Sequence, residues 1–158
     1  MQFRIGHGYD IHQLASGGRL FVAGVVVSEE MSAVAHSDGD VAIHALVDAI
    51  LGATGGGDIG EHFPNSDARW RGASSGHFLA EAVRLAAAGG WKVVNADITV
   101  LAERPKLHAF KPAMTEAISH HLGTTAVNVK AGTHEGCDAI GRGEAIAAHA
   151  VVLLTRNV

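Results

Sequence analysis

The sequence is poor in cysteine, in charged residues and in long apolar runs. Cys137 is the only cysteine, which excludes an intramolecular disulfide and a thiolate-rich structural zinc site. Charged residues make up 18% of the chain and the 12 basic ones are scattered, a pattern that argues against a nucleic-acid partner. No apolar run approaches the length of a membrane span, and the N-terminus lacks the apolar core of a signal peptide. We therefore expect a soluble, cytoplasmic protein with no membrane partner.

The chain does contain enough apolar residues for one large core. It has 158 residues, of which 47% are hydrophobic. Folding of a chain this long buries roughly 70% of the surface that the unfolded chain exposes. We expect a single domain that spans residues 1–158. Histidine is abundant, at 11 residues against 12 lysines and arginines together, which is compatible with a metal site without showing one.

Residues 3–12 alternate between apolar and polar side chains, which predicts a half-buried strand. Gly6 and Gly8 fall on the same face as Asp10 and His12. Because glycine has no side chain, a ligand or another backbone can approach that face closely. A bulge or crowded packing is the alternative explanation of the two glycines.

The rest of the chain alternates helical and strand-like segments, with no repeat and no linker. Ser37 followed by Asp40 is a capping-box pattern, which predicts a helix from Ser37 to about Leu51, ended by Gly52. Residues 53–73 form a loop of about twenty residues, and loops of that length tend to be functional or mobile. We further expect strands at 20–27, 92–102, 127–131 and 145–154, a loop at 28–35, and helices at 75–88 and 109–122.

This order of elements favours an α+β fold, with a mixed four- to five-stranded sheet and helices on one face. The strand at 145–154 is apolar on both faces, with His149 as the main exception. Helices can cover only one of those faces. A subunit interface is the expected cover for the other.

Asp10, His12 and His44 are candidate metal ligands. Asp10 and His12 are two residues apart on a strand, so their side chains leave the same face. A carboxylate with two imidazoles suits zinc, and three protein ligands leave a fourth coordination position open. An isolated Asp-x-His is weak support, and a helical histidine is often only packed or solvated. Asp48, one turn after His44, is expected to orient that imidazole or to be merely solvated.

Two further segments have the composition of an anion or substrate site. His36 and Ser37 stand where the first N–H groups of the predicted helix would point at a phosphate, although capping by Ser37 explains them equally well. Residues 55–60 match the glycine spacing of a dinucleotide-binding loop, but they follow a helix and not a strand, so we reject that function. Their glycines instead favour a tight loop that presents Asp58 and Gly60.

Polar residues also follow the later strands. The Arg104-Pro105-Lys106 segment ends one strand, and Lys130, Thr133 and Glu135 follow the next. Cations and a hydroxyl near a carboxylate can hold a diphosphate together with a hard ion such as magnesium. Each of these residues is also compatible with an ordinary loop, and residues 141–144 with a simple β-turn.

Seven motifs in order along the chain resemble the 2-C-methyl-D-erythritol 2,4-cyclodiphosphate synthase family. They are RIGHGYDIH at 4–12, AHSDGD at 35–40, HAL at 44–46, GDIG at 57–60, RPK at 104–106, NVKA at 128–131 and GRGE at 141–144. They span nearly the whole chain, and the first two, with His44, are highly specific.

The resemblance implies a reaction of the non-mevalonate isoprenoid pathway. The substrate would be 4-diphosphocytidyl-2-C-methyl-D-erythritol 2-phosphate. Its 2-phosphate would attack the β-phosphorus, expel CMP and close a cyclic diphosphate, which makes the enzyme a phosphorus-oxygen lyase. Because nucleophile and electrophile are both anionic, metal ions are needed to offset their repulsion. No protein nucleophile or general base is required, and the 53–73 loop is a plausible lid that excludes water.

The resemblance also assigns residues. It implies zinc or another divalent ion on Asp10, His12 and His44, and magnesium or manganese on Glu135. It implies catalytic roles for His36, Lys130 and Thr133. The implied substrate-binding residues are Asp10, His12, His36, Ser37, Asp58, Ile59, Gly60, Phe63, Asp67, Ala102, Pro105, Lys106, Ala131, Gly132, Thr133, Glu135 and Arg142. The 102–108 segment and residues 131–133 would form the pocket for the cytidine nucleotide.

The family forms homotrimers with each site shared between neighbouring subunits, and some members bind isoprenoid diphosphates at the trimer axis through the residue that matches Arg142. Asn65, Gly132 and the 136–140 segment depart from the usual family sequence.

Two other functions stay open from the residues alone. One is a phosphohydrolase with a zinc-bound water, and the other is a non-catalytic module that binds a terpenoid diphosphate.

Overall fold

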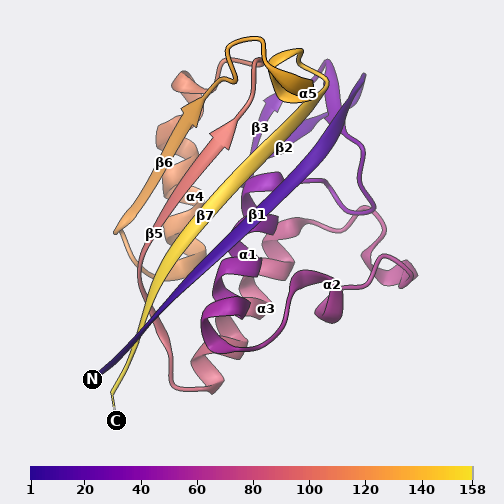
Figure 1. Ribbon diagram of the computed structural model, residues 1–158. Helices are drawn as coiled ribbons and strands as arrows, with labels where there is room; N and C mark the ends of the chain where they lie inside the picture. The colour runs from indigo at the N-terminus through magenta and orange to yellow at the C-terminus, as the bar shows by residue number, and fades with distance from the viewer. Residues whose placement is uncertain (158) are drawn as a thin grey trace.

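The computed structural model describes residues 1–157 as a mixed sheet with helices packed against it (Figure 1). The strands are β1 (Gln2–Ser16), β2 (Leu20–Val22), β3 (Val25–Ser28), β4 (Met31–Ala33), β5 (Lys92–Leu101), β6 (Val127–Gly132) and β7 (Ala145–Arg156). The helices are α1 (Val41–Thr54), α2 (Ile59–His62), α3 (Ser75–Ala88), α4 (Lys111–Leu122) and α5 (Asp138–Gly141), with single 3-10 turns η1 (Ala68–Trp70) and η2 (His108–Phe110).

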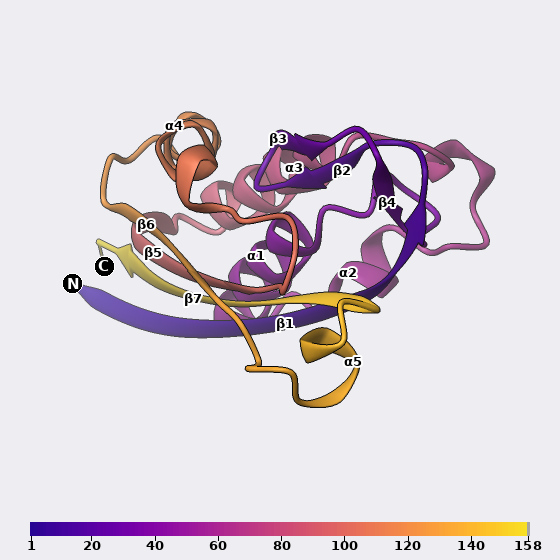
Figure 2. The ribbon, with the colours of Figure 1, turned by 90° about the horizontal axis from the view of Figure 1, so that it is seen from above.

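The main sheet has five strands in the order β4-β1-β7-β5-β6. Only β5 and β6 pair in parallel, while β1 pairs antiparallel with β4 and β7, and β7 antiparallel with β5. The helices α1, α3 and α4 lie on one face of this sheet, and the short α5 lies on the other (Figure 2). The predicted α+β fold with a mixed sheet and helices on one face is therefore confirmed, with α5 as the exception.

The two glycines of β1 allow α1 to pack directly against the strand. A Cβ atom on Gly6 would lie 1.8 Å from the carbonyl oxygen of Ala49, and one on Gly8 would lie 1.8 Å from that of Ala45. Neither distance is possible for real atoms, so any larger residue would push the helix away. The prediction of a close backbone approach is confirmed, and the approaching backbone is that of α1.

The predicted strand at 20–27 is wrong, because a turn divides it into β2 and β3. Ala23 and Gly24 adopt positive φ angles of 51° and 80°, and both of their backbone N–H groups donate to the buried carboxylate of Asp40, at 2.8 and 2.6 Å. The predicted loop at 28–35 also contains a short strand, β4, which pairs with the end of β1.

The predicted helix start at Ser37 is wrong as well. Gly39 has a φ of 70°, which is incompatible with a right-handed helix, so α1 begins at Val41. Asp40 is the N-cap and accepts a hydrogen bond from Ile43 N at 3.1 Å. The helix also continues through Gly52 and ends at Gly55, which takes the left-handed conformation.

The remaining elements follow the predictions closely. The helix predicted at 75–88 has those bounds, and the strands predicted at 92–102, 127–131 and 145–154 match β5, β6 and β7 to within two residues. The helix predicted at 109–122 begins at Lys111, after η2. The loop at 53–73 contains α2 and η1.

On β1 and β7, the sheet face opposite the helices exposes large apolar side chains in the single chain. Ile5 is 73% exposed, Phe3 57% and Val151 43%, and they lie on β1 and β7, which run side by side. The apolar side chains of β1 thus point away from the helices. The opposite face of β1, with Gly6, Gly8, Asp10 and His12, packs on α1. Across residues 1–157, none of the helices has both the length and the apolar character needed to span a bilayer.

Candidate active site

Asp10, His12 and His44 bring three ligand atoms together at the junction of β1 and α1. Asp10 Oδ2 lies 2.9 Å from His12 Nε2 and 3.0 Å from His44 Nδ1, and the two nitrogens are 3.1 Å apart. Ligand atoms around a tetrahedral zinc ion lie about 3.3 Å from one another, since each is about 2.0–2.1 Å from the metal. The three atoms therefore form one face of such a tetrahedron, and the residues fit a divalent ion with an open fourth position.

The fold explains why these residues meet. The alternation of β1 turns Asp10 and His12 toward the helical layer, and Gly8 lets α1 approach at that level. His44 lies in the first turn of α1 and is only 8% exposed. The strand thus supplies two ligands and the helix supplies the third.

The site favours the charged form of its carboxylate. Burial by itself would raise the pKa of Asp10, but hydrogen bonds from His12 and His44 outweigh burial and lower that pKa from 3.8 to about 2. Asp10 is therefore ionised across the physiological range, as a metal ligand must be.

The second ring nitrogen of His44 contacts two serines. His44 Nε2 lies 2.9 Å from Ser75 Oγ and 3.1 Å from Ser37 Oγ. Of the two alternatives for Asp48, the structure does not bear out orientation of this imidazole, because the Asp48 carboxylate accepts a hydrogen bond from Ile59 N at 2.7 Å instead. Burial raises the pKa of Asp48. Nothing in the sequence placed Ser75, at the start of α3, beside the metal ligands.

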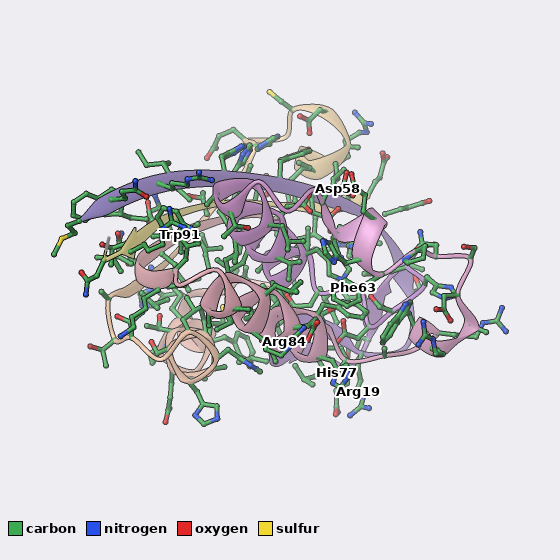
Figure 3. The ribbon with its side chains drawn as sticks, turned by 90° about the horizontal axis from the view of Figure 1, so that it is seen from below. Arg19, Asp58, Phe63, His77, Arg84 and Trp91 are labelled. Atoms are coloured by element: carbon green, nitrogen blue, oxygen red, sulfur yellow. The ribbon has the colours of Figure 1, made fainter. Side chains whose placement is uncertain are left out.

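A cavity of about 420 Å³ opens over the three ligands. Eight of the residues singled out from the sequence line it, namely Asp10, His12, His36, Ser37, His44, Ile59, Gly60 and Phe63. Val34, Ala35, Pro64, Asn65, Trp70 and Phe78 complete the wall. Figure 3 shows Phe63 on the inner side of the segment that follows α2, where its ring stacks on Phe78 at 4.5 Å.

Two predicted substrate-binding carboxylates do not line this cavity. Asp58 caps α2, with its Oδ1 accepting from Glu61 N at 3.0 Å, and lies at the start of that helix (Figure 3). Asp67 forms an ion pair with Arg69 at 2.6 Å. Its hydrogen bonds with Arg69 lower the pKa of Asp67. In the single chain both carboxylates have structural partners within their own loop.

A second, smaller cavity lies where the parallel pair β5–β6 ends. It has a volume of about 170 Å³ and is lined by Ala102, Pro105, Lys106, Leu107, His108, Lys111, Ala131, Gly132 and Thr133. Six of these were named as substrate-binding residues, and Leu107 and His108 lie in the 102–108 segment that the resemblance assigned to the cytidine pocket. Of the lining residues in question, Lys111 was the one missed, because it was placed inside the helix predicted at 109–122.

The residues around the second cavity are held by polar contacts. Thr133 Oγ1 donates to Glu135 at 2.8 Å, and Glu135 has a positive φ of 51°. Lys130 is turned away, in a 2.6 Å ion pair with Asp97 on the neighbouring strand. Arg142 pairs with Glu144 at 3.0 Å next to α5, apart from both cavities.

The two cavities share no lining residue. The first is built on β1 and the second at the β5–β6 edge, with β7 between β1 and β5. A single chain therefore does not join the predicted metal ligands and the predicted nucleotide-binding residues into one site.

The fold and the first cavity define the class of protein, an α+β protein with a site suited to a divalent metal ion. The chain belongs to the YgbB family, which matches residues 3–155. A relative from Desulfosudis oleivorans, named 2-C-methyl-D-erythritol 2,4-cyclodiphosphate synthase, is 53% identical over 153 residues, or 96% of this chain and 91% of the relative. The resemblance inferred from the motifs is thereby confirmed.

Solved structures agree with this assignment. The bifunctional IspDF from Campylobacter jejuni superposes with a TM-score of 0.95 at 41% identity, and the match covers 99% of this chain and 43% of that one. The CDP complex of IspF from Plasmodium falciparum superposes with a TM-score of 0.86 at 35% identity, over 99% of this chain and 97% of that one.

Proposed function

We propose that this chain converts 4-diphosphocytidyl-2-C-methyl-D-erythritol 2-phosphate to 2-C-methyl-D-erythritol 2,4-cyclodiphosphate and CMP, as a phosphorus-oxygen lyase of isoprenoid biosynthesis. Residues 1–158 would act as one catalytic domain. The convergence of Asp10, His12 and His44 on one point of a cavity carries the proposal, because phosphoryl transfer between two anionic groups needs a cation at the reacting phosphate.

The ion proposed for this site is zinc, because two imidazoles and one carboxylate form a donor set that suits it. A second ion, magnesium or manganese, would be held by Glu135, whose hard oxygen ligands suit those metals. Bound there, the two ions supply positive charge that offsets the repulsion between the attacking 2-phosphate and the diphosphate.

The residues of the chain would bind, align and shield the substrate. His36 and Ser37 face the metal cavity and would contact phosphate oxygens, while Phe63 and Trp70 form an apolar wall that limits water. In the second cavity Lys106 and Lys111 supply positive charge for the nucleotide phosphates. Because the nucleophile is part of the substrate, correct folding of the bound molecule can lower the barrier by about 7–11 kcal/mol.

A complete site would form between neighbouring subunits of a homotrimer. Two observations support this proposal, since the two cavities are separate in one chain and the outer face of β1 and β7 exposes a patch of apolar side chains. A heterologous contact repeated around a closed ring would bring the metal cavity of one subunit to the nucleotide cavity of the next. Binding of an isoprenoid diphosphate near Arg142 stays a prediction.

Turnover of the candidate substrate by the metal-stripped protein, with zinc and magnesium restored separately and together, tests the proposal. We expect CMP and a cyclic diphosphate, identified by phosphorus NMR, only when both ions are present. A linear diphosphate product would indicate a phosphohydrolase. Full turnover by the His44→Ala variant would contradict a role for the metal site and favour a non-catalytic binding module.

A further inference from the structure

We propose that Ser75, held by Asp38, is a positioning residue that fixes the imidazole of His44 for metal binding. Ser75 would accept the Nε2–H of His44 and so direct Nδ1 toward Asp10 and His12. The inference rests on the proposed function only in taking His44 as a metal ligand. It concerns two residues that lie outside the three ligands and come from other parts of the chain.

The contact between Ser75 and His44 is buried and short. Ser75 Oγ lies 2.9 Å from His44 Nε2, on the side of the ring opposite Nδ1, and Ser75 is 0% exposed. Nδ1 is the nitrogen that faces Asp10 Oδ2, at 3.0 Å. Ser75 therefore contacts the nitrogen that does not face the metal position, where a partner can set the orientation of the ring.

Asp38 determines the direction of the hydrogen bond. The Ser75 hydroxyl lies against Asp38 Oδ1, and the Ser75 backbone N–H donates to Asp38 Oδ2 at 2.9 Å. Asp40 N also donates to Asp38 Oδ1, at 3.2 Å. A carboxylate only accepts hydrogen bonds, so the single hydroxyl proton of Ser75 goes to Asp38, and Ser75 Oγ is left to accept from His44 Nε2–H.

This direction suits a metal ligand. In the metal-free protein Nδ1 donates a hydrogen bond to Asp10. A metal ion that displaces this proton leaves a neutral imidazole with its proton on Nε2 and its Nδ1 lone pair free to bind the ion. The negative charge of Asp38 polarises the serine hydroxyl and so strengthens the hydrogen bond that Ser75 accepts from the ring. The arrangement corresponds to the common carboxylate–histidine–metal sequence with one hydroxyl inserted.

Ser37 differs from Ser75 in its role, although Ser37 Oγ also lies 3.1 Å from His44 Nε2. Ser37 Oγ accepts from Gly39 N at 3.3 Å and, within residues 1–157, has no carboxylate partner. Its hydroxyl proton is therefore not committed to an acid group. Ser37 also lines the metal cavity, where that proton can be offered to a ligand.

The variants Ser75→Ala and Asp38→Asn test the proposal, and Ser74→Ala is the matched control. Ser74 is the neighbouring serine at the N-cap of α3, and its side chain makes no capping hydrogen bond. Ser75→Ala keeps the backbone N–H that donates to Asp38, so α3 keeps its start. Asp38→Asn keeps the shape of the side chain but removes its charge and lets the amide donate to Ser75.

The primary measurement is zinc affinity, by competition with a chromophoric chelator, on protein shown to be folded by circular dichroism. We expect Ser75→Ala and Asp38→Asn to bind zinc about 10–100-fold more weakly than the unmodified protein, and Ser74→Ala to bind it equally well. The second measurement is proton NMR of the zinc-loaded protein. The His44 Nε2–H should give a signal protected from solvent exchange, which Ser75→Ala loses and Ser74→Ala keeps.

Unchanged zinc affinity and an unchanged Nε2–H signal in folded Ser75→Ala would overturn the proposal. If Ser75→Ala does not fold, the zinc affinity of Asp38→Asn is the deciding measurement. Unchanged zinc affinity in folded Asp38→Asn would then overturn the proposal. Failure of the unmodified protein to bind zinc at all would instead overturn the proposed metal site, so the two failures are distinguishable.

Discussion

At the level of single residues, the candidate site places an ionised carboxylate against two histidine rings. Asp10 lies within 3.0 Å of a nitrogen of both His12 and His44, and its pKa is lowered to about 2. The carboxylate is therefore more acidic in the folded protein than in the unfolded chain. A difference of this kind makes the stability of the fold depend on pH.

The acid stability of the metal-free protein should depend on Asp10. Between about pH 4 and pH 2 the unfolded chain takes up a proton at this residue before the folded protein does, so stability present above pH 4 is lost as the pH falls, by about 2 kcal/mol. In Asp10→Asn this contribution is absent, and the free energy of unfolding should fall less steeply. Urea unfolding of both proteins at several acidic pH values measures the difference, and parallel curves would contradict it.

The sequence identified the candidate metal ligands but not the residues that hydrogen-bond to them. Asp10 and His12 share one face of a strand by spacing alone, and the surrounding motif singled out His44. Ser75 lies 31 residues after His44, on a different helix, so only packing between α1 and α3 brings the two together. Asp48 was chosen by its spacing along the helix, but the backbone of Ile59 satisfies its carboxylate.

At the level of elements, the site depends on how closely β1 and α1 approach each other. Gly8 lies two residues before Asp10, and Ala45, whose carbonyl a Cβ on Gly8 would meet at 1.8 Å, follows His44. The same contact that builds the core therefore sets the distance between the strand ligands and the helix ligand.

Replacing Gly8 with alanine should damage both stability and metal binding. The added methyl group has no room, so the strand and helix must separate, at a cost of about 1–3 kcal/mol in the free energy of unfolding. Zinc affinity should fall as well, because His44 moves away from Asp10 and His12. Chemical unfolding and chelator competition measure the two effects.

Gly52→Ala is the control for this substitution. Gly52 lies inside α1, and a Cβ there has nothing within 4 Å. Alanine should stabilise the helix by about 0.5–1 kcal/mol and leave zinc affinity unchanged. If Gly8→Ala behaves like Gly52→Ala, the close contact does not control the site.

Local pattern predicted the helices and long strands well and the hairpins poorly. The bounds of α3 followed from its apolar spacing, and β5, β6 and β7 from their apolar runs. The break between β2 and β3 depends on Asp40, which receives hydrogen bonds from Ala23 and Gly24 across the fold. The order of apolar residues in the 20–27 segment cannot reveal this contact, because Asp40 lies 16 residues or more further along the chain.

At the level of the whole molecule, the proposed function requires each active site to combine the metal cavity of one chain with the nucleotide cavity of another. Both cavities contain residues that the motifs assign to one substrate, yet they lie at different parts of the sheet and share no residue. The apolar outer face of β1 and β7 offers a surface on which chains can associate. From sequence, the expectation of a subunit interface followed from a strand that is apolar on both faces.

Mixing two inactive variants tests this claim most directly. His12→Ala disables the metal cavity and Glu135→Gln the residue beside the nucleotide cavity, so each variant alone should release no CMP. In randomly mixed rings, a site is intact when a Glu135→Gln chain supplies the metal cavity and its neighbour, a His12→Ala chain, supplies the other half. Co-expressed variants should therefore recover about one quarter of the normal activity, whatever the size of the ring. CMP release no greater than that of the separate variants would contradict a shared site.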